Sequence, residues 1–353
     1  MKQRTSLALG VAVSLFFLWL GFRGLNLNEL LDTLGSVNLL WIAVAVPVYF
    51  VATYILTWRW YYLLRPVKDI HPNRLFPVVV IGYMANNLLP LRLGEVMRAY
   101  VLKRRDETPI APTLTTIFVE RVFDGLVMLT LIFIALFFVD FEEPTLRTII
   151  FLTSPLFFGA LLLFFWLASA PDIARRLYSW LIKTFVPSPL QERALSVVEQ
   201  LMSGLESLRS GRAMLQVIFF SLWSWLVESS TYWIVMQAFD FKVSFSVLLL
   251  VVGFGNLSTI LPSTSGYIGT FHAVAILTLV AFDVDRVAAG SYAIVMHATL
   301  WLPITLAGLI FLIRLGFHWS DFRTAQEVVH NTEEAIDSTT PTQLLNDESE
   351  ALV

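Results

Sequence analysis

The chain has 353 residues, of which 57% are hydrophobic and only 14% are charged, and its formal net charge at pH 7 is −3. A soluble domain carries about 25% charged residues, so this composition indicates a membrane protein. The absence of cysteine excludes disulfides and thiolate metal sites, and the weakly acidic balance argues against a nucleic-acid-binding protein.

Apolar segments long enough to cross a bilayer recur along the chain. A transmembrane helix needs about 20 mostly apolar residues, and the candidates are Ser6–Phe22, Leu39–Tyr62, Thr113–Val139, Thr148–Ala168, Met214–Phe239 and Val287–Ile313. Lys2 and Arg4 precede the first segment, as in a secretory signal, but no small-residue cleavage site follows it. We therefore expect this first segment to be retained as a helix.

Two further apolar stretches are interrupted by short polar motifs that contain proline. They are Leu75–Pro90 followed by Leu91–Leu102, and Val243–Pro262 followed by Gly266–Phe282. Each lies between two long apolar segments, and the single segment Thr148–Ala168 reverses the orientation of the second half. This pattern predicts an all-α polytopic membrane protein with about six full transmembrane helices plus two re-entrant helical hairpins in an inverted repeat, as in many transporters. In the alternative, Pro90 and Pro262 only kink two ordinary hairpins.

The distribution of positive charge predicts the orientation in the membrane. With a cytoplasmic N-terminus, most Lys and Arg residues, including Arg59 and Lys103–Arg105, fall in cytoplasmic segments. External segments hold only Arg23, Arg147, Lys242 and Arg286. We expect a multi-pass protein of the plasma or inner membrane with both termini in the cytoplasm. Residues 1–317 form the predicted transmembrane domain, residues 318–353 an acidic, disordered cytoplasmic tail, and Pro171–Arg212 an amphipathic hairpin along the membrane.

Charged residues inside apolar segments are costly and therefore paired or functional. One cluster, just after Pro90, contains Arg92, Glu95 and Arg98, and the spacing of three predicts that each neighbours the next. A second cluster contains Glu120, Arg121 and Asp124, in which Arg121 and Asp124 are three residues apart. Together with Asn86 and Asn87, these residues predict one polar site within the membrane.

The same motifs resemble a known family. The stretch Asn86–Glu95, Arg98 and the stretch Glu120–Asp124 resemble the lysylphosphatidylglycerol synthase transmembrane, or flippase-like, family, and Pro262–Phe271 is similar to its second motif. The resemblance runs from about Ser6 to Arg314. It implies a membrane part that moves an anionic or aminoacylated phospholipid, or a polyprenyl or other lipid carrier. No soluble synthase domain follows the last helix, so the resemblance does not imply lysyl transfer.

The candidate substrate-binding residues are Asn86, Asn87, Arg92, Glu95, Arg98, Glu120, Arg121, Asp124, Asn256, Ser263, Thr264 and His272. Guanidinium groups bind phosphate through a bidentate fork, although a structural ion-pair network uses the same residues. Ser263 and Thr264 are equally suited to helix capping. His272 stands where family members commonly carry an acid, and Glu228 is a further buried acid without an identifiable partner. We predict no catalytic residue, metal site or cofactor.

Three functions remain open at this point. The first is a flippase-like transporter, which we favour because of the inverted repeat and the charges at its break. The second is a membrane-embedded lipid-modifying enzyme that uses Glu120 and Asp124 as acid and base. The third is a regulatory membrane subunit of a lipid-synthesis enzyme. A homo-oligomer is compatible with each of them.

Overall fold

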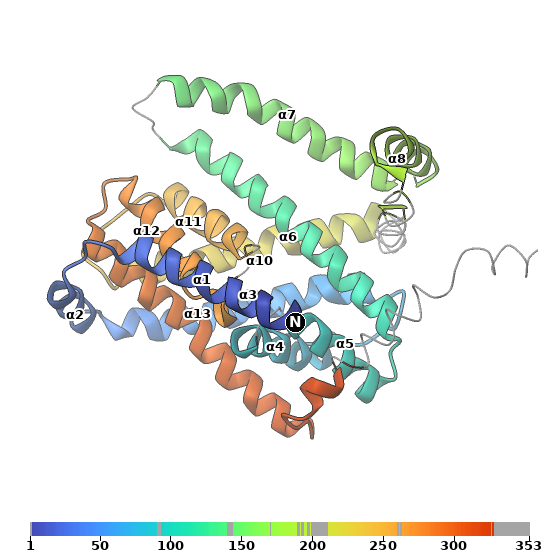
Figure 1. Cartoon of the computed structure of the whole chain (residues 1–353), viewed down its shortest axis with the longest axis horizontal. Helices are drawn as coiled ribbons and strands as arrows, with labels where there is room; N and C mark the ends of the chain where they lie inside the picture. The colour runs from blue at the N-terminus through green and yellow to red at the C-terminus, as the bar shows by residue number, and fades with distance from the viewer. Residues whose placement is uncertain are drawn as a thin grey trace, which may run out of the picture.

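The structure is a computed structural model, and it describes residues 2–89, 93–139, 144–169, 171–188, 191, 194–195, 198, 211–259, 261, 263–325 and 327. Within these residues every regular element is a helix (Figure 1). The elements are α1 (Lys2–Phe22), α2 (Leu27–Gly35), α3 (Leu39–Leu64), α4 (Pro72–Leu88), α5 (Leu93–Asp106), α6 (Ile110–Phe138), α7 (Pro144–Ser169), α8 (Pro171–Phe185), α10 (Gly211–Met236), α11 (Phe245–Ser258), the 3₁₀ helix η1 (Ser265–Tyr267), α12 (Thr270–Val280) and α13 (Arg286–Arg314).

The described residues do not confirm the predicted number of membrane-spanning helices. Among the described residues, 4 helices are long and apolar enough: α3, α6, α10 and α13. The count rises to 5 if α1 and α2, which meet at a bend of 84°, form one broken span. The sequence analysis missed α2 because its 9 residues are too few to stand out as an apolar segment. The structure thus confirms an all-helical protein with several apolar helices, but not the count of six full spans.

Side chains at the helix starts explain where several long helices begin. The Asn38 side chain accepts a hydrogen bond from the backbone N–H of Leu40 at the start of α3. Asp285 accepts two such bonds, from Val287 and Ala288, at the start of α13. These contacts satisfy backbone donors that have no partner within the helix.

Both interrupted stretches form helical hairpins. The helix α5 folds back along α4, and the backbone N–H of Gly94 donates to Oδ1 of Asn86 at 2.8 Å. The helix α12 folds back along α11 in the same way, through the turn that contains η1. Each hairpin packs on the last long helix of the other half: α4 packs on α13, and α11 packs on α6. The first long helices of the halves, α3 and α10, pack on each other, so the contacts between the halves are reciprocal.

The first hairpin depends on the absence of a side chain at Gly94. A Cβ atom there would overlap the carbonyl oxygen of Gly82 and lie 2.6 Å from Oδ1 of Asn86. We expect Gly94→Ala to destabilise the protein by about 1–3 kcal/mol, as overpacking does, and to lower the Tm of the purified protein. Gly125→Ala in α6 is the matched control, because nothing lies within 4 Å of a Cβ atom there. An unchanged Tm for Gly94→Ala would contradict the close helix approach.

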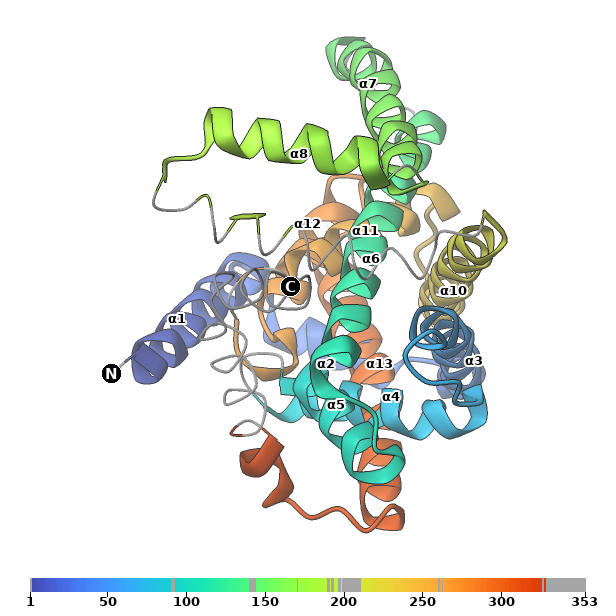
Figure 2. The same cartoon turned by 90° about the vertical axis from the view of Figure 1, so that its right-hand side faces the viewer.

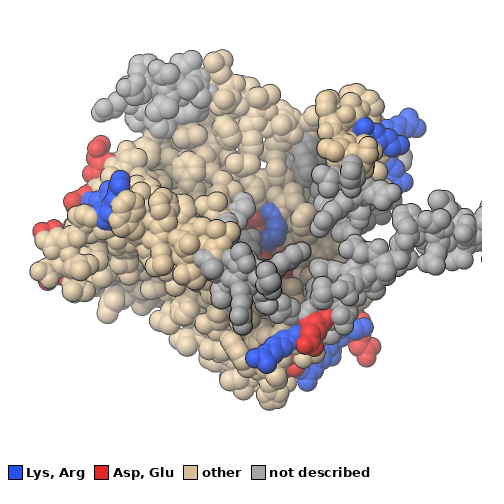
Figure 3. Space-filling view, in the orientation of Figure 1, with Lys and Arg blue, Asp and Glu red and all other residues tan. Residues whose placement is uncertain are grey.

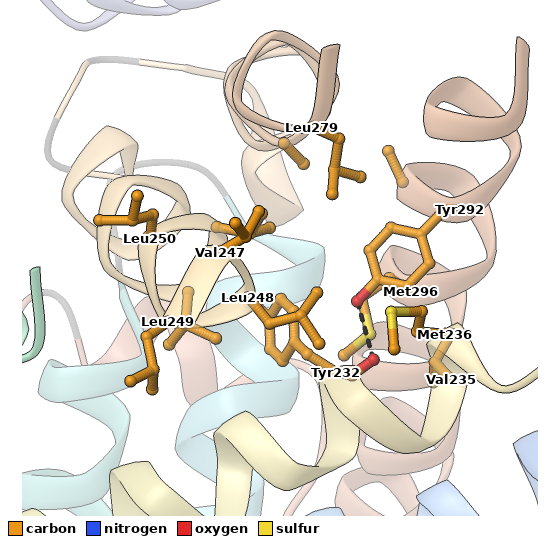
Figure 4. Close-up of a cluster of buried hydrophobic side chains, with 14 of the residues drawn as sticks. Tyr232, Val235, Met236, Val247, Leu248, Leu249, Leu250, Leu279, Tyr292 and Met296 are labelled. Carbon is orange, nitrogen blue, oxygen red and sulfur yellow. Dashed lines mark hydrogen bonds between the residues drawn. The ribbon is translucent and has the colours of Figure 1, made fainter. Parts of the chain in front are cut away.

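The second half encloses an extensive apolar core. Figure 4 shows Leu248 of α11, Tyr232 of α10 and Tyr292 of α13 pointing toward one another. The Tyr292 hydroxyl donates to the backbone carbonyl of Tyr232 at 2.9 Å, so its one polar group is satisfied inside the apolar cluster. This core fixes the second hairpin against α10 and α13.

Two segments lie at the periphery. The helix α7 stands away from the main bundle and α8 extends across its end (Figure 2). The helix α8 exposes Ile173, Trp180 and Phe185, which fits the predicted amphipathic segment, whereas most of residues 189–210 lie outside the described residues. In the predicted tail, Phe322 is buried and Arg104 pairs with Asp321 at 2.9 Å. Residues 326 and 328–353 lie outside the described residues, so the predicted disorder stays a prediction.

Re-entrant hairpins predict a distinctive labelling pattern. Asp69 and Lys103 are exposed and flank the first hairpin, while Asp240 and Ala281 are exposed and flank the second. The chain has no cysteine, so single cysteine variants at these positions report directly. We expect an impermeant maleimide to label the first two from the cytoplasmic side and the other two from outside. Labelling of positions 69 and 103 from opposite sides would show that the first hairpin crosses the membrane.

Candidate functional site

Glu120 is the centre of a buried ion-pair network. Its side chain on α6 is fully buried. Arg98 of α5 binds both carboxylate oxygens in a bidentate fork, at 3.0 and 2.9 Å. Arg121 also pairs with Glu120, and Nη2 of Arg59 on α3 lies 3.4 Å from Oε1. One carboxylate therefore faces three guanidinium groups from three helices, which is the kind of pairing that a buried charge requires.

Asp124, one turn further along α6, extends this network to α10. Its Oδ1 atom accepts from Nη1 of Arg59 at 2.5 Å and from the indole N–H of Trp225 at 2.9 Å. Nη2 of Arg121 lies 3.2 Å from Oδ2, which is the pair predicted from the spacing of three. The sequence analysis placed Arg59 among the cytoplasmic charges and did not include Trp225. Arg59 is instead fully buried, and both residues belong to the network.

A cavity of about 140 Å³ lies beside the network. Residues from both hairpins and from α3, α6, α10 and α13 line it: Tyr49, Tyr83, Asn86, Asn87, Arg121, Trp225, Glu228, Tyr232, Asn256, Thr259, Gly266, Tyr267, Phe271, His297, Leu300 and Trp301. Arg121 belongs both to the network and to this lining, and its side chain is 33% exposed. Figure 3 shows charged atoms at the floor of a hollow near the centre of this face, whereas the other charged groups in view lie toward its edges.

Four of the predicted site residues line this cavity: Asn86, Asn87, Arg121 and Asn256. Asn87 donates to the hydroxyl of Thr305 at 2.8 Å, which ties the first hairpin to α13. Glu95 and Arg98 line a second, smaller cavity together with Asn86 and Arg121. Glu120 and Asp124 are not part of the cavity lining, and both pair with the guanidinium group of Arg121.

The predicted contact between Glu95 and Arg98 takes a different form. Arg98 turns toward Glu120, with its guanidinium group 3.9 Å from the centre of the Trp60 ring. Glu95 is instead 3.5 Å from the amide of Asn86. Arg98 pairs with Glu120 rather than with Glu95, because a bidentate pair with a fully buried carboxylate is the stronger interaction. Arg92, the third member of this cluster, lies outside the described residues.

The remaining predicted residues face α1 and α13 rather than the cavity. Thr264 bonds with the hydroxyl of Ser14 on α1 at 3.0 Å, and its backbone N–H donates to the same oxygen at 2.8 Å. It precedes η1 without capping it, and Ser263 contacts the Thr264 carbonyl at 3.4 Å. His272 stacks on His297, with 4.6 Å between ring centres, and only His297 reaches the cavity lining.

These features define a polytopic α-helical membrane protein whose polar cavity lies between two broken helical hairpins. The chain belongs to the family of the lysylphosphatidylglycerol synthase transmembrane region, which matches residues 7–308.

Several archaeal proteins are similar to the chain. A UPF0104 membrane protein of Methanothermobacter thermautotrophicus is 29% identical over 273 residues, which cover 72% of this chain and 77% of that protein. The UPF0104 membrane protein MJ1595 of Methanocaldococcus jannaschii is 21% identical over 307 residues, covering 84% and 91%. The glycosyltransferase AglD of Haloferax volcanii is 24% identical over 334 residues, covering 87% of this chain but 54% of that protein. No solved structure matches the chain significantly.

Proposed function

We propose that this protein binds a lipid with a phosphate-bearing headgroup and moves it between the two leaflets of the membrane. The substrate classes are an anionic or aminoacylated phospholipid, or a polyprenyl or other lipid-linked carrier. The observation that carries the proposal is Arg121, a partly exposed guanidinium group at a cavity between two reciprocally packed hairpins. Similarity to a glycosyltransferase keeps a lipid carrier within the substrate class.

The geometry supports anion binding at Arg121 in particular. Its Nη2 atom is held by Glu120 and Asp124, while the side chain as a whole stays 33% exposed at the cavity. Guanidinium groups bind phosphate more readily when fixed in place, because less freedom is lost on binding. The enzyme alternative receives less support, since neither Glu120 nor Asp124 belongs to the cavity lining.

Transport in a reconstituted system tests the proposal. Proteoliposomes would contain acyl-labelled fluorescent phosphatidylglycerol, phosphatidylethanolamine or phosphatidylcholine, or a fluorescent polyprenyl phosphate. An impermeant reductant then bleaches the outer leaflet, and transport appears as additional loss of fluorescence. We expect faster loss than in protein-free liposomes for at least one lipid. Equal rates for every lipid would contradict the proposal, and a new covalent product by mass spectrometry would favour an enzyme.

A further inference from the structure

Glu228 is a carboxylate that the ion-pair network does not use. It lies on α10 and lines the same cavity as Arg121. Within the described part of the chain, no Lys, Arg or His nitrogen lies within 4.0 Å of its carboxylate. A carboxylate at a cavity deep in an apolar bundle normally has a cationic partner. Without a cationic partner, the negative charge of Glu228 must be neutralised in another way, for which protonation of the carboxylate is the simplest.

The groups around Glu228 supply little positive charge. The titratable residues that neighbour it or share the cavity are Tyr49 from α3, Tyr83 from α4, Arg121 and Asp124 from α6, Tyr232 from α10 itself, Tyr267 from η1 and His297 from α13. The helix α11 contributes the neutral Asn256. Arg121 is the cation in this set, and it is already shared between Glu120 and Asp124.

An anion that enters this cavity therefore meets a second negative charge. Repulsion between an ionised Glu228 and a phosphate oxygen is strong, because the surroundings are apolar and screen it poorly. Protonation of Glu228 removes the repulsion and supplies an O–H donor for the phosphate. Since linkage is reciprocal, an anion that prefers protonated Glu228 must also favour its protonation.

We propose that an anionic lipid headgroup occupies this cavity together with one proton, carried on the carboxylate of Glu228. This inference rests on the proposed function. The proton comes from water and forms one O–H bond as the headgroup binds, and it returns to water when the headgroup leaves. A lipid that crosses the membrane in this way is accompanied by a proton.

His297 is the competing proton acceptor, and its position argues against this role. Its ring is stacked on His272 at 4.6 Å and edge-on to Phe271 at 5.4 Å. A positive charge on one imidazole would lie against the face of a second one in apolar surroundings. Glu228 needs only to lose a charge, which its position inside an apolar helix bundle favours.

Binding and proton uptake can be measured together in detergent. The full-length protein would be titrated with short-chain dioctanoyl phosphatidylglycerol in weakly buffered solution that contains a pH-indicator dye. We expect up to one proton taken up per lipid bound. Across a pH series, the affinity should fall by up to about tenfold per pH unit above the range in which Glu228 is protonated. In Glu228→Gln, binding should become independent of pH and occur without uptake. Glu29→Gln, at an exposed carboxylate on α2, should behave like the wild-type protein.

Other outcomes would overturn the inference. Equal proton uptake by wild-type protein and Glu228→Gln would exclude Glu228 as the residue that takes up the proton. Loss of proton uptake in His297→Gln would assign the proton to the histidine. Lipid binding by wild-type protein without pH dependence would reject proton linkage even if Glu228→Gln failed to fold. Selective loss of phosphatidylethanolamine binding in Glu228→Gln, without proton uptake, would show that the carboxylate binds an ammonium group. If wild-type protein bound no lipid, the proposed function would fail as well.

Discussion

Arg121→Ala is expected to reduce lipid translocation by roughly tenfold to a hundredfold, since hydrogen bonds to a charged group contribute about 1.5–3 kcal/mol. The fold should survive because both carboxylates keep other partners. Glu120 retains Arg98 and Arg59, and Asp124 retains Arg59 and Trp225. The measurement is the initial rate of fluorescent-lipid translocation in proteoliposomes that contain equal amounts of folded protein.

Arg121→Lys separates charge from geometry. It keeps the positive charge but loses the planar fork, so an intermediate rate is expected. Arg104→Ala is the control, because Arg104 is half exposed and pairs with Asp321 outside the cavity. Arg121→Ala with the wild-type rate would remove this residue from the transport site.

Glu120→Gln is expected to have the largest effect on stability. The substitution removes the charge that faces Arg59, Arg98 and Arg121, and leaves Asp124 to compensate for Arg59 and Arg121. Removing one partner of a buried ion pair costs about 3–5 kcal/mol. We expect a large loss of monodisperse protein. The measurement is size-exclusion chromatography of the protein after detergent extraction.

The double variant Arg98→Met, Glu120→Gln tests whether unpaired charge is the cause. Replacing Arg98 removes the cation that has no second acid partner in the described network. The yield of folded protein should therefore recover in part. If Glu120→Gln matched Glu29→Gln in yield and Tm, the network would not stabilise the fold.

The helices and their interruptions were predictable because they depend on local properties. Runs of apolar residues mark the long helices, and the motifs ending in Pro90 and Pro262 mark the turns of both hairpins. The short helix α2 escaped prediction because its stability depends on packing against α13. The number of spans could not be fixed for a similar reason, since bends such as the one between α1 and α2 depend on tertiary contacts.

The polar site was predictable where charged residues interrupt an apolar segment. This reasoning identified Glu120, Arg121 and Asp124, and it applied equally to Arg59 between Trp58 and Trp60. Arg59 was assigned to the cytoplasm because it lies close to the end of its segment. Trp225 carries no such signal, because it is an uncharged residue in the middle of an apolar segment. The stacking of His272 on His297 joins residues of two helices, which spacing along one helix does not reveal.

The carboxylate of Asp124 has a mechanical consequence. It is bonded at once to Arg59 on α3 and to Trp225 on α10, the first long helices of the two halves, which pack on each other. Any rocking of one half against the other must carry Asp124 along with both helices or break one of these bonds. The Asp124 carboxylate therefore links the contact between α3 and α10 to the guanidinium group of Arg121 at the cavity.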